Sequence, residues 1–114
     1  MSQFYSKIDH YKKVMNSLGI ECDAELLTAV TKGLGPSIYK ADSETISGNC
    51  ESELVTVKNS FLNKKLGIGD VSRYDDAIKT VCARMGNSNK NKYRAIFYYL
   101  LVKEFRREYV YELN

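Results

Sequence analysis

One stretch of the sequence decides the fold, residues 93–102, which read YRAIFYYLLV. Arg94 is its only charged residue, so a helix over this stretch is apolar almost all round. Such a helix has no polar face for solvent and normally lies surrounded at the centre of a fold. We therefore predict a helix over residues 89–107 at the middle of the protein. The apolar stretch is too short for a membrane span, which needs roughly 20 residues.

Before this stretch, apolar residues recur at intervals of three and four positions, which is typical of amphipathic helices. Asp23 is a good N-cap, and Gly19 and Gly86 can end helices because glycine adopts positive φ without strain. The predicted helices cover residues 3–18, 23–32, 51–66 and 72–85. The sequence thus predicts an all-α fold, a compact array of about five helices with the C-terminal helix central. We expect a single domain over residues 1–114.

Residues 36–50 are the one long stretch without a clear period. Ile38, Tyr39 and Ile46 are apolar, but most of their neighbours are Ser, Asp, Gly and Asn. We expect a short helical turn near residues 37–41 and then a loop. Loops of this length are uncommon inside a compact domain and often carry function.

The cysteines and the single histidine restrict the chemistry. Cys22, Cys50 and Cys82 are an odd number, and no two of them form a C-x-x-C pair. We expect reduced thiols and a cytoplasmic location. His10 lies beside Asp9 on a polar face of the first predicted helix, which favours a solvated surface residue. No catalytic set, metal site or cofactor site is predicted, and we expect the protein not to be an enzyme.

The start of the last predicted helix breaks a local rule of charge. Earlier helices open with acids, whereas this one opens with Lys90, Lys92 and Arg94, at the end where the helix dipole is already positive. Each such cation costs about 0.3–1 kcal/mol at a surface. One interpretation is an anion pocket for phosphate, carboxylate or a nucleic-acid backbone. Its candidate residues are Ser88, Asn89, Lys90, Asn91, Lys92 and Arg94.

We favour a structural interpretation of this basic corner, in which aspartates of the preceding segment pair with the cations. The candidates are Asp70, Asp75 and Asp76. Nucleic-acid binding by a helix-turn-helix over residues 72–107 is less favoured, because the body of the second helix is apolar. The net charge of +3 is also small for that role.

Tyrosines give the other candidate surface. The chain has nine, and three of them form the predicted interaction surface: Tyr39, Tyr109 and Tyr111. Exposed tyrosine favours protein interfaces, although core packing with the hydroxyl reaching water is the simpler account. Residues 109–111 can either dock back on the protein or pair with a second chain. We therefore favour a non-enzymatic protein-interaction module, binding a protein partner or itself, with anion or nucleic-acid binding as the alternative.

Three runs together resemble one family of small bacterial proteins that is known only as a domain of unknown function. They are residues 32–39, KGLGPSIY, residues 61–67, FLNKKLG, and residues 91–101, NKYRAIFYYLL. The resemblance spans most of the chain. It implies a compact helical protein of the bacterial cytosol, and it assigns no catalytic residue, cofactor or partner.

Overall fold

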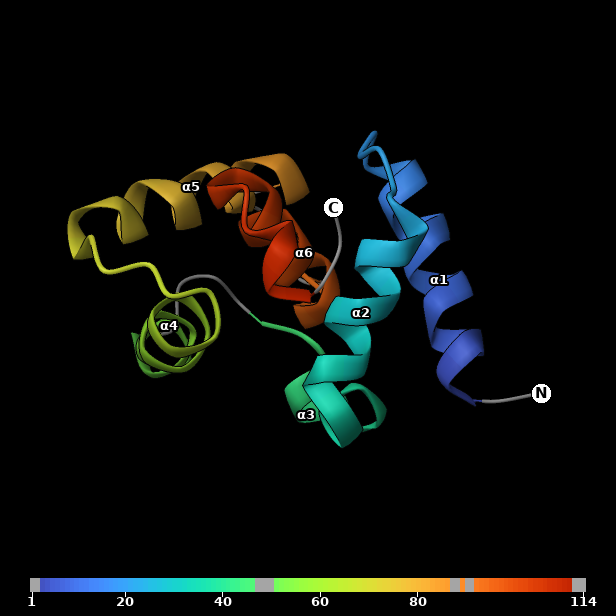
Figure 1. Cartoon of the computed structure of the whole chain (residues 1–114). Coiled ribbons are helices and arrows are strands. Elements are labelled where there is room, and N and C mark those ends of the chain that lie inside the picture. The colour runs from blue at the N-terminus through green and yellow to red at the C-terminus, as the bar shows by residue number, and fades with distance from the viewer. Residues whose placement is uncertain (1–2, 47–50, 87–88, 90–91, 112–114) are drawn as a thin grey trace.

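The computed structural model describes residues 3–46, 51–86, 89 and 92–111, and within them it confirms the all-α fold (Figure 1). No strand occurs among the described residues, apart from an isolated bridge between Thr45 and Tyr93. The α-helices are α1 (Gln3–Ser17), α2 (Ala24–Leu34), α3 (Ala41–Glu44), α4 (Glu51–Thr56), α5 (Tyr74–Met85) and α6 (Arg94–Phe105). Four other helical segments are η1 (Gly35–Tyr39), η2 (Val57–Lys65), η3 (Val71–Arg73) and η4 (Glu108–Tyr111).

Helix α6 is the most buried element of the described fold. Nine of its 12 residues are buried, as the apolar sequence predicts. It contacts α1, α2, α3 and α5, and Figure 1 shows it between α5 on one side and α2 on the other. The stacked rings of Phe61 and Tyr98, with centroids 4.0 Å apart, join it to η2 as well.

The predicted start of this helix at residue 89 was wrong. Tyr93 has an extended backbone (φ −65°, ψ 131°) and pairs with Thr45, while the Ile46 N–H donates to the Lys92 carbonyl at 2.8 Å. This pairing with a distant segment keeps Lys92 and Tyr93 out of the helix, which begins at Arg94. At the other end, Arg106 adopts a left-handed conformation (φ 55°), so α6 ends at Phe105, before the predicted end at residue 107.

The predicted helical turn near residues 37–41 is confirmed, but the loop predicted after it was wrong over Ala41–Glu44. Gly35–Tyr39 is a 3-10 helix and Ala41–Glu44 an α-helix, whereas residues 47–50 lie outside the described part of the chain. Ile38 and Ile46 are both buried, so the segment is anchored by its few apolar side chains. The predicted helix over residues 51–66 exists, but it changes from an α-helix to a π-helix at Val57.

Within the described residues, no helix is both long enough and apolar enough to cross a membrane.

Candidate functional site

The two described cations of the basic corner are engaged by carbonyls of the protein itself. Lys92 is only 2% exposed, and its Nζ donates to the Asn89 carbonyl at 2.7 Å. The Arg94 Nε donates to the Ser43 carbonyl at 2.8 Å, and its Nη1 donates to the Tyr98 hydroxyl at 3.1 Å. Both side chains therefore hold the segment before α6 in place.

The other parts of that prediction stand as follows. Ser88, Lys90 and Asn91 lie outside the described residues, so the anion pocket as a whole stays a prediction. The favoured pairing with aspartates was wrong for Lys92 and Arg94, because these two side chains reach carbonyls instead. The aspartates have other partners: Asp75 pairs with Lys58 at 2.8 Å, and Asp70 accepts from the Ser72 N–H at 3.1 Å.

The predicted tyrosine surface is divided by the structure. Tyr39 and Tyr109 are 44% and 61% exposed. Tyr111 instead docks back on the protein, where the Lys65 Nζ lies 4.8 Å from its ring centroid and its Cε1 would lie 3.8 Å from a Cβ added at Gly33. Burial raises the pKa of Tyr111 to about 12. A Cβ at position 33 would make only an ordinary van der Waals contact with the docked ring, so the docking does not require glycine there.

His10 is exposed, as predicted, but it is not isolated. Its Nε2 lies 3.1 Å from the Tyr93 hydroxyl, and the two rings meet edge to face. Together with Lys7 and Tyr39 it borders a wide surface hollow of about 510 Å³ on α1. The Lys7 ammonium points elsewhere, since it pairs with Glu44 at 2.9 Å.

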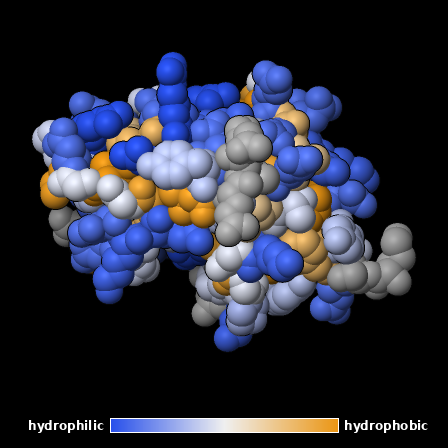
Figure 2. Space-filling view, in the orientation of Figure 1, coloured by the Kyte–Doolittle hydropathy of each residue, from blue (hydrophilic) through white to orange (hydrophobic). Residues whose placement is uncertain are grey.

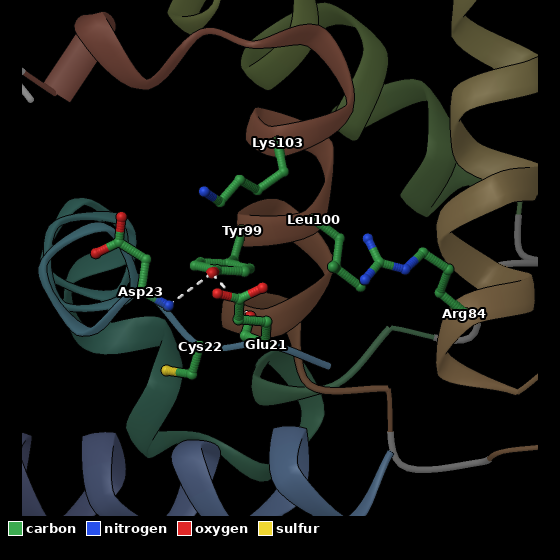
Figure 3. A pocket seen from close by; sticks show the side chains of 7 residues that line it. All are labelled: Glu21, Cys22, Asp23, Arg84, Tyr99, Leu100 and Lys103. Carbon is green, nitrogen blue, oxygen red and sulfur yellow. Dashed lines mark hydrogen bonds between the residues drawn. The ribbon is translucent and has the colours of Figure 1, made fainter. Parts of the chain in front are cut away.

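A second hollow, of about 520 Å³, lies where the α1–α2 connection meets α5 and α6 (Figure 3). We call it the charged cleft. It is lined by Glu21, Cys22, Asp23, Arg84, Tyr99, Leu100 and Lys103. Its volume is within the range of about 300–1,000 Å³ that is typical of small-molecule sites.

Tyr99 joins the two sides of the charged cleft. Its hydroxyl accepts a hydrogen bond from the Asp23 N–H at 2.8 Å and donates one to the Glu21 carbonyl at 3.1 Å. Burial raises the pKa of this phenol, so the hydroxyl keeps its proton at neutral pH. A phenol oxygen has two lone pairs, and one of them is not used by these bonds. Tyr99 therefore fixes the α1–α2 connection against α6.

Two cations and two carboxylates line the same hollow as this hydroxyl. Figure 3 shows Arg84 and Lys103 entering from α5 and α6, while Glu21 and Asp23 come from the connection. In the part of the chain that the structure describes, no ion pair joins these cations to these carboxylates. The charged cleft is thus lined by charges that do not neutralise one another by direct contact.

The individual charges differ in how far they are engaged. The Asp23 carboxylate caps α2 by accepting from the N–H groups of Glu25 and Leu26. The Lys103 Nζ lies 3.5 Å from a Glu108 carboxylate oxygen, longer than the roughly 2.7–2.9 Å of a good charge-assisted bond. Among the described residues, the side chains of Glu21 and Arg84 have no hydrogen-bond or ion-pair partner, and both residues are exposed.

The chemistry available in the charged cleft is that of binding. Burial raises the pKa of the Cys22 thiol, which keeps it neutral and a poor nucleophile at neutral pH. The one histidine of the chain lines the other hollow. No three His, Cys, Asp or Glu side chains of the described residues come together as metal ligands.

Sequence reasoning missed this site. Asp23 is identifiable from the sequence only as a helix cap, and the lining residues of α5 and α6 are distant from it in the chain. The Asp23–Tyr99 bond alone spans 76 positions. Neither spacing nor periodicity indicates that these side chains meet.

Comparison with known proteins adds a family and no activity. Residues 9–109 match a family described as "Protein of unknown function (DUF2853)". That range includes every residue that lines the charged cleft. No curated protein matches the chain.

Proposed function

The chain belongs to the DUF2853 family, and we propose that it is a non-enzymatic binding protein that holds a small polar molecule in the charged cleft. The family description names no activity, so the proposal depends on the geometry of the cleft alone.

One observation carries the proposal: four charged side chains surround one hollow without pairing across it. Arg84 and Glu21 have the greatest freedom to bind a ligand, since neither side chain has a partner among the described residues. A hydrogen bond to a charged group contributes about 1.5–3 kcal/mol. Two or three such bonds contribute about 3–9 kcal/mol, and after the cost of immobilising the ligand, about 4 kcal/mol or more, the expected affinity is about millimolar.

The lining supports binding more than catalysis. A nucleophilic mechanism needs an activated side chain and a base that contacts it. Cys22 is held as a neutral thiol, and Tyr99 as a neutral phenol with its proton already donated to the Glu21 carbonyl. The residues that remain are suited to recognising charge.

The test is a titration of the ¹⁵N-labelled full chain with free amino acids, dicarboxylic acids and sugar phosphates, followed by amide chemical shifts. We expect saturable shifts for residues 21–23 and 84 and for the middle of α6. Arg84→Glu should abolish them, whereas Lys79→Glu, an exposed change on the same helix outside the cleft, should not. If none of these compounds shifts the cleft amides at about 10 mM, the proposal is wrong.

A second candidate function is binding of a protein partner through Tyr39 and Tyr109. Their exposure supports it, and Tyr109 is held in position because its hydroxyl accepts from the Arg107 Nη1 at 2.8 Å. The face in Figure 2 is largely hydrophilic with separated apolar patches, so single rings rather than a broad apolar face would form the contact.

The first partner to test is a second copy of this chain. Sedimentation velocity at rising concentration should show self-association that is lost in a Tyr39→Ser, Tyr109→Ser double variant. Tyr5→Ser is the matched control, since Tyr5 is also 61% exposed. A protein that stays monomeric at millimolar concentration would count against this candidate.

We also propose a cytoplasmic location. The support is that Cys22 and Cys82 are free thiols, as expected in a reducing compartment. Cell fractionation with a tagged full-length chain tests it, and recovery outside the cytoplasmic fraction would contradict it.

A further inference from the structure

We infer that the ligand of the charged cleft is amphoteric, with an anionic group held by Arg84 and Lys103 and an ammonium group held by Glu21 and Asp23. This inference rests on the proposed function and names the chemical class of its ligand.

The first argument is the balance of charge around the cleft. Two cations and two carboxylates line it, so their formal charges cancel. A purely anionic ligand would be attracted by one pair and repelled by the other, and the same holds for a purely cationic one. A molecule that carries both charges, oriented with each end toward its complement, is attracted by all four side chains.

The second argument is the position of the two kinds of charge. The cations project from α5 and α6, whereas the carboxylates belong to residues 21 and 23 of the connection (Figure 3). The two carboxylates therefore share one segment, the two cations come from two neighbouring helices, and no element carries charges of both signs into the cleft. Such an arrangement gives a bound zwitterion a defined direction across the cleft.

The third argument is the hydroxyl of Tyr99. Its proton is given to the Glu21 carbonyl, so the group cannot also donate to a ligand anion. Its unused lone pair can accept an N–H, which an ammonium group supplies and a carboxylate does not. The Tyr99 hydroxyl thus favours an ammonium group over a carboxylate as its ligand partner. It lies beside the segment that carries Glu21 and Asp23, which favour the same group.

The opposite end suits a carboxylate. Arg84 offers a planar fork of N–H donors, which binds carboxylates through two parallel bonds. Lys103 is the second cation there, and its long 3.5 Å contact with Glu108 can be exchanged for a ligand oxygen. Leu100 supplies an apolar wall between the polar groups, so an aliphatic ligand body has a surface to contact.

The test uses four five-carbon probes that differ only in charge. They are 2-aminopentanoate and 5-aminopentanoate, which are zwitterions with adjacent and separated charges, pentanoate, and pentylammonium. Dissociation constants are measured on the full chain from the amide shifts of the cleft. At least one zwitterion should bind about tenfold or more tightly than either singly charged probe, which corresponds to one additional charged contact.

Two conservative variants test which side chains bind the anionic end of the ligand and which bind its ammonium end. Arg84→Gln should weaken the zwitterion about tenfold and should not weaken pentylammonium, whereas Glu21→Gln should weaken the zwitterion and should not weaken pentanoate, since each change also removes a repulsion of the singly charged probe. Both positions are exposed, so the fold should persist, and Lys79→Gln serves as the control.

The outcomes separate this inference from the proposed function. If pentanoate or pentylammonium binds as tightly as both zwitterions, the amphoteric ligand is wrong and the binding function stands. The inference is also wrong if a zwitterion binds best but neither variant alters the preference. If no probe and no compound of the wider set shifts the cleft amides, the proposed function itself fails.

Discussion

Replacing Tyr99 by phenylalanine tests the junction on which the charged cleft depends. The change removes only the hydroxyl from a side chain that is 1% exposed, so the packing of the ring is retained. Two hydrogen bonds disappear, the one from the Asp23 N–H at 2.8 Å and the one to the Glu21 carbonyl at 3.1 Å. Each contributes about 0.5–1.5 kcal/mol net, so the free energy of unfolding should fall by about 1–3 kcal/mol.

Urea denaturation followed by circular dichroism measures this loss. With a slope of about 1–3 kcal/mol per molar urea, the midpoint should fall by roughly 1 M. Hydrogen exchange should also show a loss of protection at the Asp23 amide. Tyr93→Phe is the matched control, because within the described part of the chain its hydroxyl hydrogen-bonds only to the exposed His10, and we expect a loss below about 0.5 kcal/mol.

The reasoning is refuted if Tyr99→Phe unfolds within about 0.5 kcal/mol of the parent and the Asp23 amide stays protected. That result would mean that the two bonds do not hold the connection to α6 in solution.

Three further predictions concern other parts of the fold. The pair with Lys58 lowers the pKa of Asp75, so its stabilising effect is present above the ordinary value of 3.8 and is lost as the pH falls below it. Asp75→Asn should therefore flatten the acid side of a stability profile measured by urea melts from pH 7 to pH 2, and an unchanged profile would show that the pair is not formed. Arg106→Gly should raise the free energy of unfolding by up to about 1 kcal/mol, because glycine adopts the positive φ at that position without strain; a decrease in a thermal melt would contradict this. Lys92→Met should lower it by about 1.5–3 kcal/mol through loss of the bond to the Asn89 carbonyl, and a neutral result in the same assay would show that this bond is replaced by water.

Helices with local signals could be predicted closely from the sequence. Apolar spacing and glycine stops predict helices over residues 3–18 and 72–85, and the structure has Gln3–Ser17 and Tyr74–Met85. The start of α6 could not be predicted in this way, because a bridge to Thr45, 48 positions earlier, determines it. Local sequence carries no information about such a partner.

The candidate site could not be predicted from the sequence for a related reason. Charged residues such as Arg84 and Lys103 have no period that distinguishes a cleft wall from an ordinary solvated face. The burial of Lys92 could not be predicted from the sequence either. A lysine next to a helix start is normally expected at the surface, and only the structure shows that its ammonium bonds to the Asn89 carbonyl. The sequence therefore indicates which helix is central. The candidate site depends on which other segments pack against that helix, and the sequence does not indicate those.

The junction at Tyr99 also has a consequence for the order of folding. The two bonds of its hydroxyl join residues that are 76 and 78 positions apart, so they must form after most of the chain has been gathered together. Helices such as α1 and α5 depend on near neighbours and can exist earlier. We therefore expect the charged cleft to be assembled late on the way to the native state. A ligand held there would bind the completed fold alone, and by mass action it would raise the melting temperature as its concentration exceeds its dissociation constant.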